Sequence, residues 1–268
     1  MSDYSRYQCL KIEKAGKLAT VTLNRGETRN QIDRQFHHEL QDVWRDLAED
    51  ADVHAILLTG AGRYFSVGGN VKGMTERPGG DVFAEGEMIE PRSARKIVNN
   101  ILDCEIPIVC AINGDCIGLA ATVALFCDIT VCAEEARIAD PHVKIGLVAG
   151  DGGAVIWPML VGPNRAKEFL MRGTLIKGAD AARMGLVNHA VPADQVYAKA
   201  REIAEELAGG ATWAIRWTKL SVNKQLKDQF NLIMDTSYAL EMMSFRTEDH
   251  MEAVRAFVEK RKPSFSGR

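Results

Sequence analysis

One short stretch of the sequence, residues 139–153, places two titratable side chains in an otherwise plain segment. The stretch reads ADPHVKIGLVAGDGG, and most of its residues are small, apolar or glycine. It contains His142, directly after a proline, and the isolated acid Asp151. Histidine changes its charge near neutral pH, so the pair suits proton transfer. Two simpler interpretations stay open: a solvated or structural histidine, and an aspartate that caps a helix beginning near Gly153.

Two glycine turns are the other places where the residue types predict chemistry. FSVGGN (65–70) follows a strand, and NGDCIGLAA (113–121) joins a strand to the beginning of a helix. Backbone amides exposed at such turns donate hydrogen bonds to a negative oxygen, helped by the helix dipole. If the turns converge, they form an oxyanion hole for an enolate or a tetrahedral intermediate. The alternative is that these glycines only permit tight bends.

Other familiar motifs are missing from the sequence. TGAGRYF (59–65) contains Gly-x-Gly, but it lacks the third glycine and opens no helix, so it is no dinucleotide fingerprint. There is no Walker loop and no Gly-x-Ser-x-Gly. No histidine, cysteine or carboxylate pair has the spacing of a zinc site. We therefore expect no metal site and no bound cofactor.

The pattern of apolar residues predicts the elements that must position these groups. Alternating or wholly apolar segments predict strands, and apolar residues at helical spacing from Ile32 predict a helix. Strands alternating with helices imply α/β layering with right-handed crossovers. From about Ala166 onward the pattern is mostly helical, and the polar stretch 75–97 is interpreted as a mobile surface loop that borders the site. The strands are expected at 18–24, 53–60, 107–113 and, as two short ones, within 129–140.

Composition limits the kind of protein. A chain of 268 residues with a net charge of −3 suits one large domain, or one domain with a helical appendage, and no run of lysine or arginine suggests nucleic-acid binding. The apolar segment 107–132 contains three Asp or Asn residues, so we interpret it as core and not as a membrane span. Six scattered cysteines without Cys-x-x-Cys, and a start without an apolar signal core, predict a cytoplasmic protein with reduced thiols.

Four segments resemble, in order, the landmarks of the enoyl-CoA hydratase/isomerase, or crotonase, superfamily: FSVGGNVKGM, PIVCAINGDCIGLAATVALFCDI, IGLVAGDGG and AFVEKRKPSF. The resemblance covers essentially the whole chain. It implies an α/β, ClpP-like spiral of ββα units over residues 1–200 and a C-terminal helical trimerisation region over 201–268. It also implies a homotrimer or dimer of trimers that acts on an acyl-CoA thioester, so that coenzyme A is part of the substrate.

The resemblance assigns binding roles by position. The two donors of the oxyanion hole are the amides of Gly69 and Leu119, where the family usually has glycine at the second position. Leucine keeps the amide but reduces the space beside it. Phe257 and Lys260 match positions that help to bind the adenine and the 3′-phosphate of coenzyme A from a neighbouring subunit. Lys260 fits a solvated residue of a basic tail equally well.

The departures from the family pattern concern the catalytic groups. Family hydratases use two glutamates, and here Thr122 and His142 occupy those positions. A threonine hydroxyl cannot be a general base near pH 7, so the usual two-glutamate hydration cannot operate. The pairing of His142 with Asp151 resembles the β-diketone hydrolases of the superfamily, which cleave a carbon–carbon bond. Glu241 falls where those enzymes have an acid that orients the histidine.

The resemblance therefore implies an enolate intermediate with His142 and Asp151 as proton-transfer groups, in C–C hydrolysis or isomerisation. His142 would activate water or protonate the enolate, Asp151 would bind or protonate a carbonyl, and Glu241 would hold the imidazole. The diketone hydrolases also have a histidine where this chain has Leu119. Because of this difference, the residues of this chain fit a CoA-linked substrate as well as they fit a free β-dicarbonyl compound.

Two other functions stay open at this stage. One is an enoyl-CoA hydratase with altered catalytic residues, and the other is a non-catalytic acyl-CoA-binding homologue. Thr122 could serve only packing or a minor polar contact, and Glu241 could be a surface or interface acid. An active enzyme is favoured if His142 and Asp151 face the two oxyanion amides, and a non-catalytic protein if they point outward.

Overall fold

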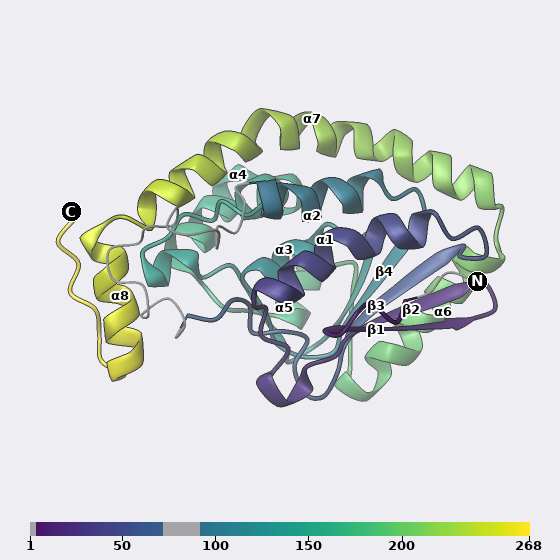
Figure 1. The fold of residues 1–268 in the computed structure, drawn as a ribbon, viewed down its shortest axis with the longest axis horizontal. Coiled ribbons are helices and arrows are strands. Elements are labelled where there is room, and N and C mark those ends of the chain that lie inside the picture. Colours follow the sequence, from purple (N-terminus) through teal and green to yellow (C-terminus); the bar gives the residue numbers. More distant parts are fainter. Residues whose placement is uncertain (1–3, 72–91) are drawn as a thin grey trace.

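The computed structural model, which describes residues 4–71 and 92–268, contains a six-stranded sheet (Figure 1). Its spatial order is β1-β2-β3-β4-β6-β9. β1 and β2 form an antiparallel hairpin, and the remaining neighbours are parallel. Every residue of β3 and β4 is buried, as expected for strands covered on both faces. The strands are β1 (Leu10–Ala15), β2 (Leu18–Leu23), β3 (Ala55–Gly60), β4 (Ile108–Ile112), β6 (Ile129–Ala133) and β9 (His189–Val191).

A second, three-stranded sheet carries the segments that lead to the site. Its order is β5 (Cys116–Ile117), β7 (Arg137–Ala139) and β8 (Ile176–Lys177). β5 pairs with β7 in parallel, so the chain leaves both strands in the same direction. β5 leads into the second glycine turn, and β7 leads into the segment with His142. The pairing therefore brings two distant parts of the sequence together.

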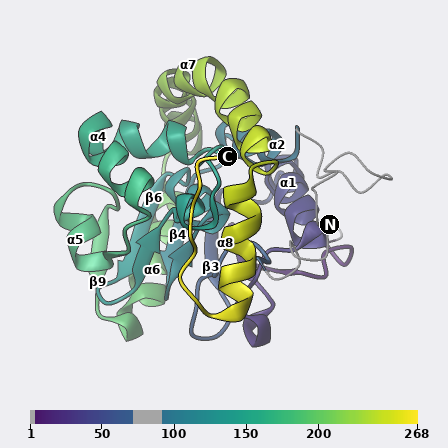
Figure 2. The same ribbon diagram turned by 90° about the vertical axis from the view of Figure 1, so that its left-hand side faces the viewer.

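Helices surround the large sheet (Figures 1 and 2). α6 lies against β3 and β4, whereas α7 lies over α2 and α4. α8 stands at one end of the molecule, and the C-terminal tail runs back along it, where the Ser266 amide donates to Asp249. The helices are α1 (Arg34–Ala48), α2 (Arg92–Asp103), α3 (Leu119–Leu125), α4 (Gly153–Arg172), α5 (Gly178–Arg183), α6 (Val196–Gly209), α7 (Thr212–Ser244) and α8 (Glu248–Glu259), with 3-10 turns η1 (Gly26–Thr28), η3 (His142–Ile145) and η4 (Ala193–Gln195).

Buried polar side chains attach α7 to the ends of the sheet layer. The ammonium group of Lys219 donates to the Ile106 carbonyl at 2.8 Å and lies 2.8 Å from a carboxylate oxygen of Asp128. Two further side chains of the same helix also donate to backbone carbonyls, Arg216 to Val53 and Asn223 to Leu102. These bonds supply donors to backbone carbonyl groups in the interior.

The α/β class and the predicted strands are confirmed, and one expectation is wrong in detail. Residues 92–97 are not part of a loop but the first half of α2, because Ile97 and Val98 begin an apolar stripe that is fully buried. The remaining part of the predicted loop, residues 75–91, lies outside the described residues. A helix expected to begin near Gly153 is present as α4, which begins there and has a non-helical backbone at Gly162.

The apolar segment 107–132 forms β4, β5, α3 and most of β6. Among the helices of the described residues, none is long and apolar enough to cross a membrane.

Candidate active site

The two predicted glycine turns lie side by side. The Ser66 amide donates to the Asp115 carbonyl, and the Ile117 amide donates to the Ser66 carbonyl, both at 3.0 Å. A Cβ at Gly68 would lie 2.6 Å from the Ile117 oxygen and 3.7 Å from the Gly118 Cα. Since φ of Gly68 is also +77°, a side chain at this position is excluded both by space and by backbone conformation. The glycines therefore allow the close approach of the two turns.

The amides of Gly69 and Leu119 stand at this junction. Leu119 is the first residue of α3, and its cap, Gly118, offers no side-chain acceptor. Within residues 4–71 and 92–268, no hydrogen bond of the protein uses either amide nitrogen. The Leu119 side chain is buried in the core, and a Cβ at Gly69 would meet no described atom within 4 Å. Both amides are therefore without an acceptor among the described residues, as the donors of an oxyanion hole must be before substrate binds.

His142 lies beside the second turn. It follows Pro141 at the beginning of η3, and its side chain is only 14% exposed. Its Cε1 would lie 3.9 Å from a Cβ at Gly118, which places the imidazole next to the second glycine turn. Nδ1 lies 2.5 Å from Oδ1 of Asp140, and Nε2 lies 3.6 Å from Oδ2 of Asp151. The imidazole is thus held between two carboxyl groups.

Asp151 faces the imidazole, and its carboxyl group also interacts with the backbone amide of Gly153, the first residue of α4. The capping position is Gly152, which makes no side-chain capping bond. Asp151 is 6% exposed, and its Oδ1 accepts a hydrogen bond from the Thr122 hydroxyl at 3.2 Å. A Cβ at Gly152 would lie 2.7 Å from Cγ2 of Thr122, so the glycine allows this close contact. Thr122, fully buried on α3, therefore orients Asp151.

Glu241 reaches the same region from α7, but it does not occupy the expected place on the imidazole. Asp140, which the sequence interpretation did not include, binds Nδ1 of His142 instead. Glu241 is 6% exposed, and its Oε2 has no hydrogen-bond partner among the described residues. That oxygen would lie 2.6 Å from a Cβ at Gly150. The sequence feature that could have pointed to Asp140 is an acidic residue two positions before the histidine and directly before Pro141.

Burial and mutual charge shift the pKa values of this cluster. Burial lowers the pKa of His142, but the carboxyl groups of Asp140 and Asp151 outweigh it and raise the pKa well above its usual value. Burial raises the pKa of Asp151, although His142 and Thr122 oppose this. Burial also raises the pKa of Glu241 to about 8, against the effect of His142. At neutral pH we therefore expect a charged imidazole and a neutral Glu241.

One group of three side chains in the described segments has atoms close enough to share a cation, namely Asp140, His142 and Asp151. Nδ1 of His142 and Oδ1 of Asp140 already bind each other, and Nε2 of His142 lies 3.6 Å from Oδ2 of Asp151. Catalytic zinc sites use three protein ligands. The arrangement fits a hydrogen-bonded proton-transfer group better than a zinc site.

The C-terminal helix holds the turn that carries the histidine. His250 of α8 is 3% exposed, and its Nδ1 donates to the Ile145 carbonyl of η3 at 2.7 Å. A Cβ at Gly146 would lie 2.8 Å from the His250 Cα, so α8 packs closely on the end of η3. Phe257 and Lys260 are exposed at the other end of α8, and their contact with coenzyme A stays a prediction.

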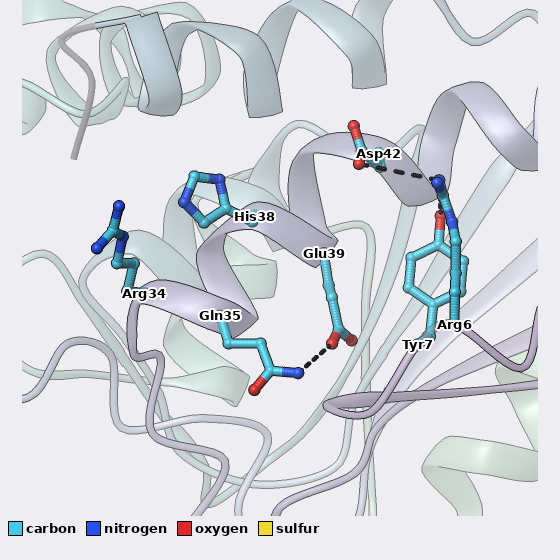
Figure 3. Close-up of a pocket in the computed structure, with 7 residues that line it drawn as sticks. All are labelled: Arg6, Tyr7, Arg34, Gln35, His38, Glu39 and Asp42. Atoms are coloured by element: carbon cyan, nitrogen blue, oxygen red, sulfur yellow. Dashed lines mark hydrogen bonds and ion pairs between the residues drawn. The ribbon is translucent and has the colours of Figure 1, made fainter. Parts of the chain in front are cut away.

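A surface cavity of about 490 Å³ lies away from this cluster, between the N-terminal segment and α1 (Figure 3). Glu39, one of its lining residues, accepts hydrogen bonds from the backbone amides of Cys9 and Leu10 at 2.9 and 3.1 Å. This carboxylate therefore attaches α1 to β1. None of the residues predicted for the active site lines the cavity.

Comparison with known proteins places this geometry in a family. A family model described as enoyl-CoA hydratase/isomerase matches residues 13–268. The chain belongs to this family. It is 32% identical over 260 residues to a short-chain-enoyl-CoA hydratase of Clostridium acetobutylicum, covering 94% of this chain and 95% of that protein. It is 28% identical over 249 residues to a 1,2-epoxyphenylacetyl-CoA isomerase of Escherichia coli, covering 93% and 95%.

A solved structure gives the same result for the fold. The crystal structure of an enoyl-CoA hydratase/isomerase from Mycobacterium paratuberculosis superposes with a TM-score of 0.87 and 34% identity, and the match covers 94% of this chain and 99% of that one. The crotonase fold predicted from the sequence is thus confirmed, and the chain is an enzyme-family member whose reaction subclass stays open.

Proposed function

We propose that the protein is an acyl-CoA enzyme that passes through an enolate, with the amides of Gly69 and Leu119 on the oxyanion and with His142 and Asp151 as proton-transfer groups. The observation that carries the proposal is the position of the imidazole. It lies beside the Gly118 turn, and Asp151 lies on the Nε2 side. This inward placement also favours an active enzyme over a non-catalytic acyl-CoA-binding homologue.

The charges of the cluster indicate the direction of proton transfer. Because the pKa of His142 is raised, the resting imidazole is charged, with a proton on each nitrogen, and cannot accept another proton. Of the two roles considered for His142, protonation of the enolate therefore fits better than activation of water. In that step the enolate carbon gains the proton from Nε2, and the carbon–oxygen double bond of the thioester re-forms. Formation of the enolate releases a proton from the attacking water or from the substrate carbon. Asp151 takes up this proton and returns it to the neutral imidazole, whose Nε2 lies 3.6 Å from its carboxyl group.

The reaction class follows from the groups that are present. The positions of the two hydratase glutamates hold Thr122 and His142, and the Thr122 hydroxyl is occupied with Asp151. We therefore propose C–C hydrolysis or isomerisation of an acyl-CoA thioester or a related β-dicarbonyl compound. The name of the Clostridium acetobutylicum relative supports a second candidate, enoyl-CoA hydration with altered catalytic residues.

A substrate comparison tests the two candidates. The purified protein is incubated with crotonyl-CoA, with a β-ketoacyl-CoA and with a cyclic β-diketone, each beside His142→Gln. Turnover of a β-dicarbonyl compound that is lost in the variant is expected. Rapid hydration of crotonyl-CoA that depends on His142 would refute C–C hydrolysis and isomerisation in favour of hydration. Absence of turnover with all three, while the CoA thioesters still bind, would support the non-catalytic alternative.

We also propose that the C-terminal region, residues 201–268, mediates a homotrimer or a dimer of trimers, and that the protein is cytoplasmic. The support for association is a set of large apolar side chains that the single chain leaves exposed on α7 and α8. Light scattering after size exclusion would give a mass of three or six chains, and a monomer would refute the assembly. These side chains are Leu232, Leu240, Met243, Phe257 and Val258.

A further inference from the structure

We infer that Asp140 is a positioning residue of this site: it fixes Nδ1 of His142, so that Nε2 faces Asp151 and the oxyanion turn. The inference rests on the proposed function of His142 as a proton donor and adds the group that sets its orientation and charge. Asp140 lies between β7 and η3, directly before Pro141. It has no direct contact with the reacting atoms in this proposal, and it acts through the imidazole.

Two hydrogen bonds connect Asp140 to the same residue. Its Oδ1 accepts from Nδ1 of His142 at 2.5 Å and from the backbone amide of His142 at 3.4 Å. The carboxylate therefore fixes the beginning of η3 and the rotation of the ring together. Nδ1 must carry a hydrogen to donate to a carboxylate, so any second proton or lone pair of the ring is on Nε2. An outer carboxylate that fixes a histidine tautomer in this way is known from metal-binding histidines.

The environment of Asp140 leaves it no other partner. Its side chain has no exposed surface, and within the described residues its Oδ2 accepts no hydrogen bond. That oxygen would lie 2.0 Å from a Cβ at Gly153, so the first turn of α4 lies directly against it. A buried carboxylate without other donors depends on a nearby positive charge. His142 is the group that the structure places there.

The titratable groups around the imidazole come from several elements. Asp140 and Asp151 flank it in the chain segments on either side of η3, and Glu241 adds a smaller effect from α7. Tyr238 of α7 is close to Asp151 and Glu241. His250 of α8 has a pKa lowered by burial and donates to the Ile145 carbonyl, so it does not compete for Asp140. Asp140 is the member of this set with a direct hydrogen bond to the ring.

The experiment compares Asp140→Asn with the unaltered protein in an NMR titration of the His142 imidazole, assigned by its loss in His142→Gln. Asparagine keeps an acceptor for Nδ1 at the same size and removes only the charge. We expect the pKa of His142 to fall by about 1 to 3 pH units, the range for loss of an adjacent opposite charge. Asp140→Ala should in addition populate the other neutral tautomer, which the ring nitrogen shifts report.

A matched control is Asp228→Asn, an exposed position on α7. This change should leave the His142 titration unaltered. An unchanged titration in Asp140→Asn would overturn the inference, because a merely structural role does not move the pKa. If Asp140→Ala fails to fold, the His142 titration in Asp140→Asn alone tests the inference.

The titration needs no substrate, so it separates this inference from the proposed function. A shifted His142 titration in a protein that turns over none of the tested substrates supports the positioning role and refutes the proposed reaction. With a turned-over substrate, kcat should fall in Asp140→Asn with little change in KM, and the pH optimum should move to lower pH. Unchanged kcat and pH profile, together with an unchanged titration, would overturn the positioning role while the proposed reaction stands.

Discussion

Replacement of Glu241 by glutamine should change how the stability of the protein depends on pH. The pKa of this carboxyl group is raised from 4.5 to about 8 in the folded state, mainly by burial. Between these two pH values the folded protein holds a proton that the unfolded chain has released. Each pH unit in this interval therefore lowers the free energy of unfolding by about 1.4 kcal/mol. Across the whole interval the loss approaches about 5 kcal/mol.

Glutamine is neutral at every pH and similar in size, so Glu241→Gln removes this loss. The expected result is that the variant gains stability relative to the original protein as the pH rises from 5 to 8, by several kcal/mol. The raised pKa of His142 also makes stability fall with rising pH, but both proteins share most of that effect. Comparing the two proteins therefore isolates the contribution of Glu241.

The assay is urea unfolding at pH 5 and pH 8, at one protein concentration because association would change the apparent stability. Glu206→Gln, at an exposed position of α6, is the matched control and should leave the pH dependence unaltered. The reasoning is refuted if the free energies of Glu241→Gln and the original protein differ by the same amount, within about 1 kcal/mol, at both pH values.

Three further substitutions test residues that support the candidate active site. Lys219→Met removes the buried ammonium group of α7 and should cost about 3 kcal/mol in thermal unfolding, whereas Lys224→Met on the exposed face should cost little; equal effects would contradict this. Gly118→Ala forces an alanine into φ +62° and ψ −132°, and it should lower kcat about a hundredfold by displacing an oxyanion amide, while unaltered kcat would argue against the oxyanion role. Thr122→Val removes a hydrogen bond to Asp151 and should move the Asp151 limb of the pH–rate profile up by about one pH unit; a profile that does not move would show the bond to be unimportant.

Many of the strands, helices and turns that position the site were predictable, because their signals lie in neighbouring residues of the sequence. An all-apolar strand, a glycine that must adopt positive φ and a helix with one apolar face each follow from neighbouring residues. The convergence of the two glycine turns is a tertiary contact, and only the resemblance to a family predicted it. The beginning of α2 was missed because its apolar stripe follows a long polar stretch, so the boundary between them gave no capping signal.

Asp140 was not identified from the sequence, and this omission has a different cause. Short-range side-chain contacts, such as Oδ1 of Asp140 on Nδ1 of His142, depend on ring rotation and on the turn that Pro141 begins. Residue spacing does not contain that information. The assignment of Glu241 used a position about one hundred residues away, and it correctly brought this acid into the cluster. It could not give the order of the neighbours around the imidazole, because burial and packing decide which carboxyl group makes contact.

The bond from His250 to the Ile145 carbonyl has a consequence for how the enzyme is made. During synthesis, His142 and Asp151 leave the ribosome long before α8, which supplies the support for η3. The sheet can form on the nascent chain, but the turn that carries the histidine lacks its anchor until the last helix has emerged. Premature termination within the last helix would therefore leave a protein with a formed sheet and an unsupported His142, the residue proposed as the proton donor.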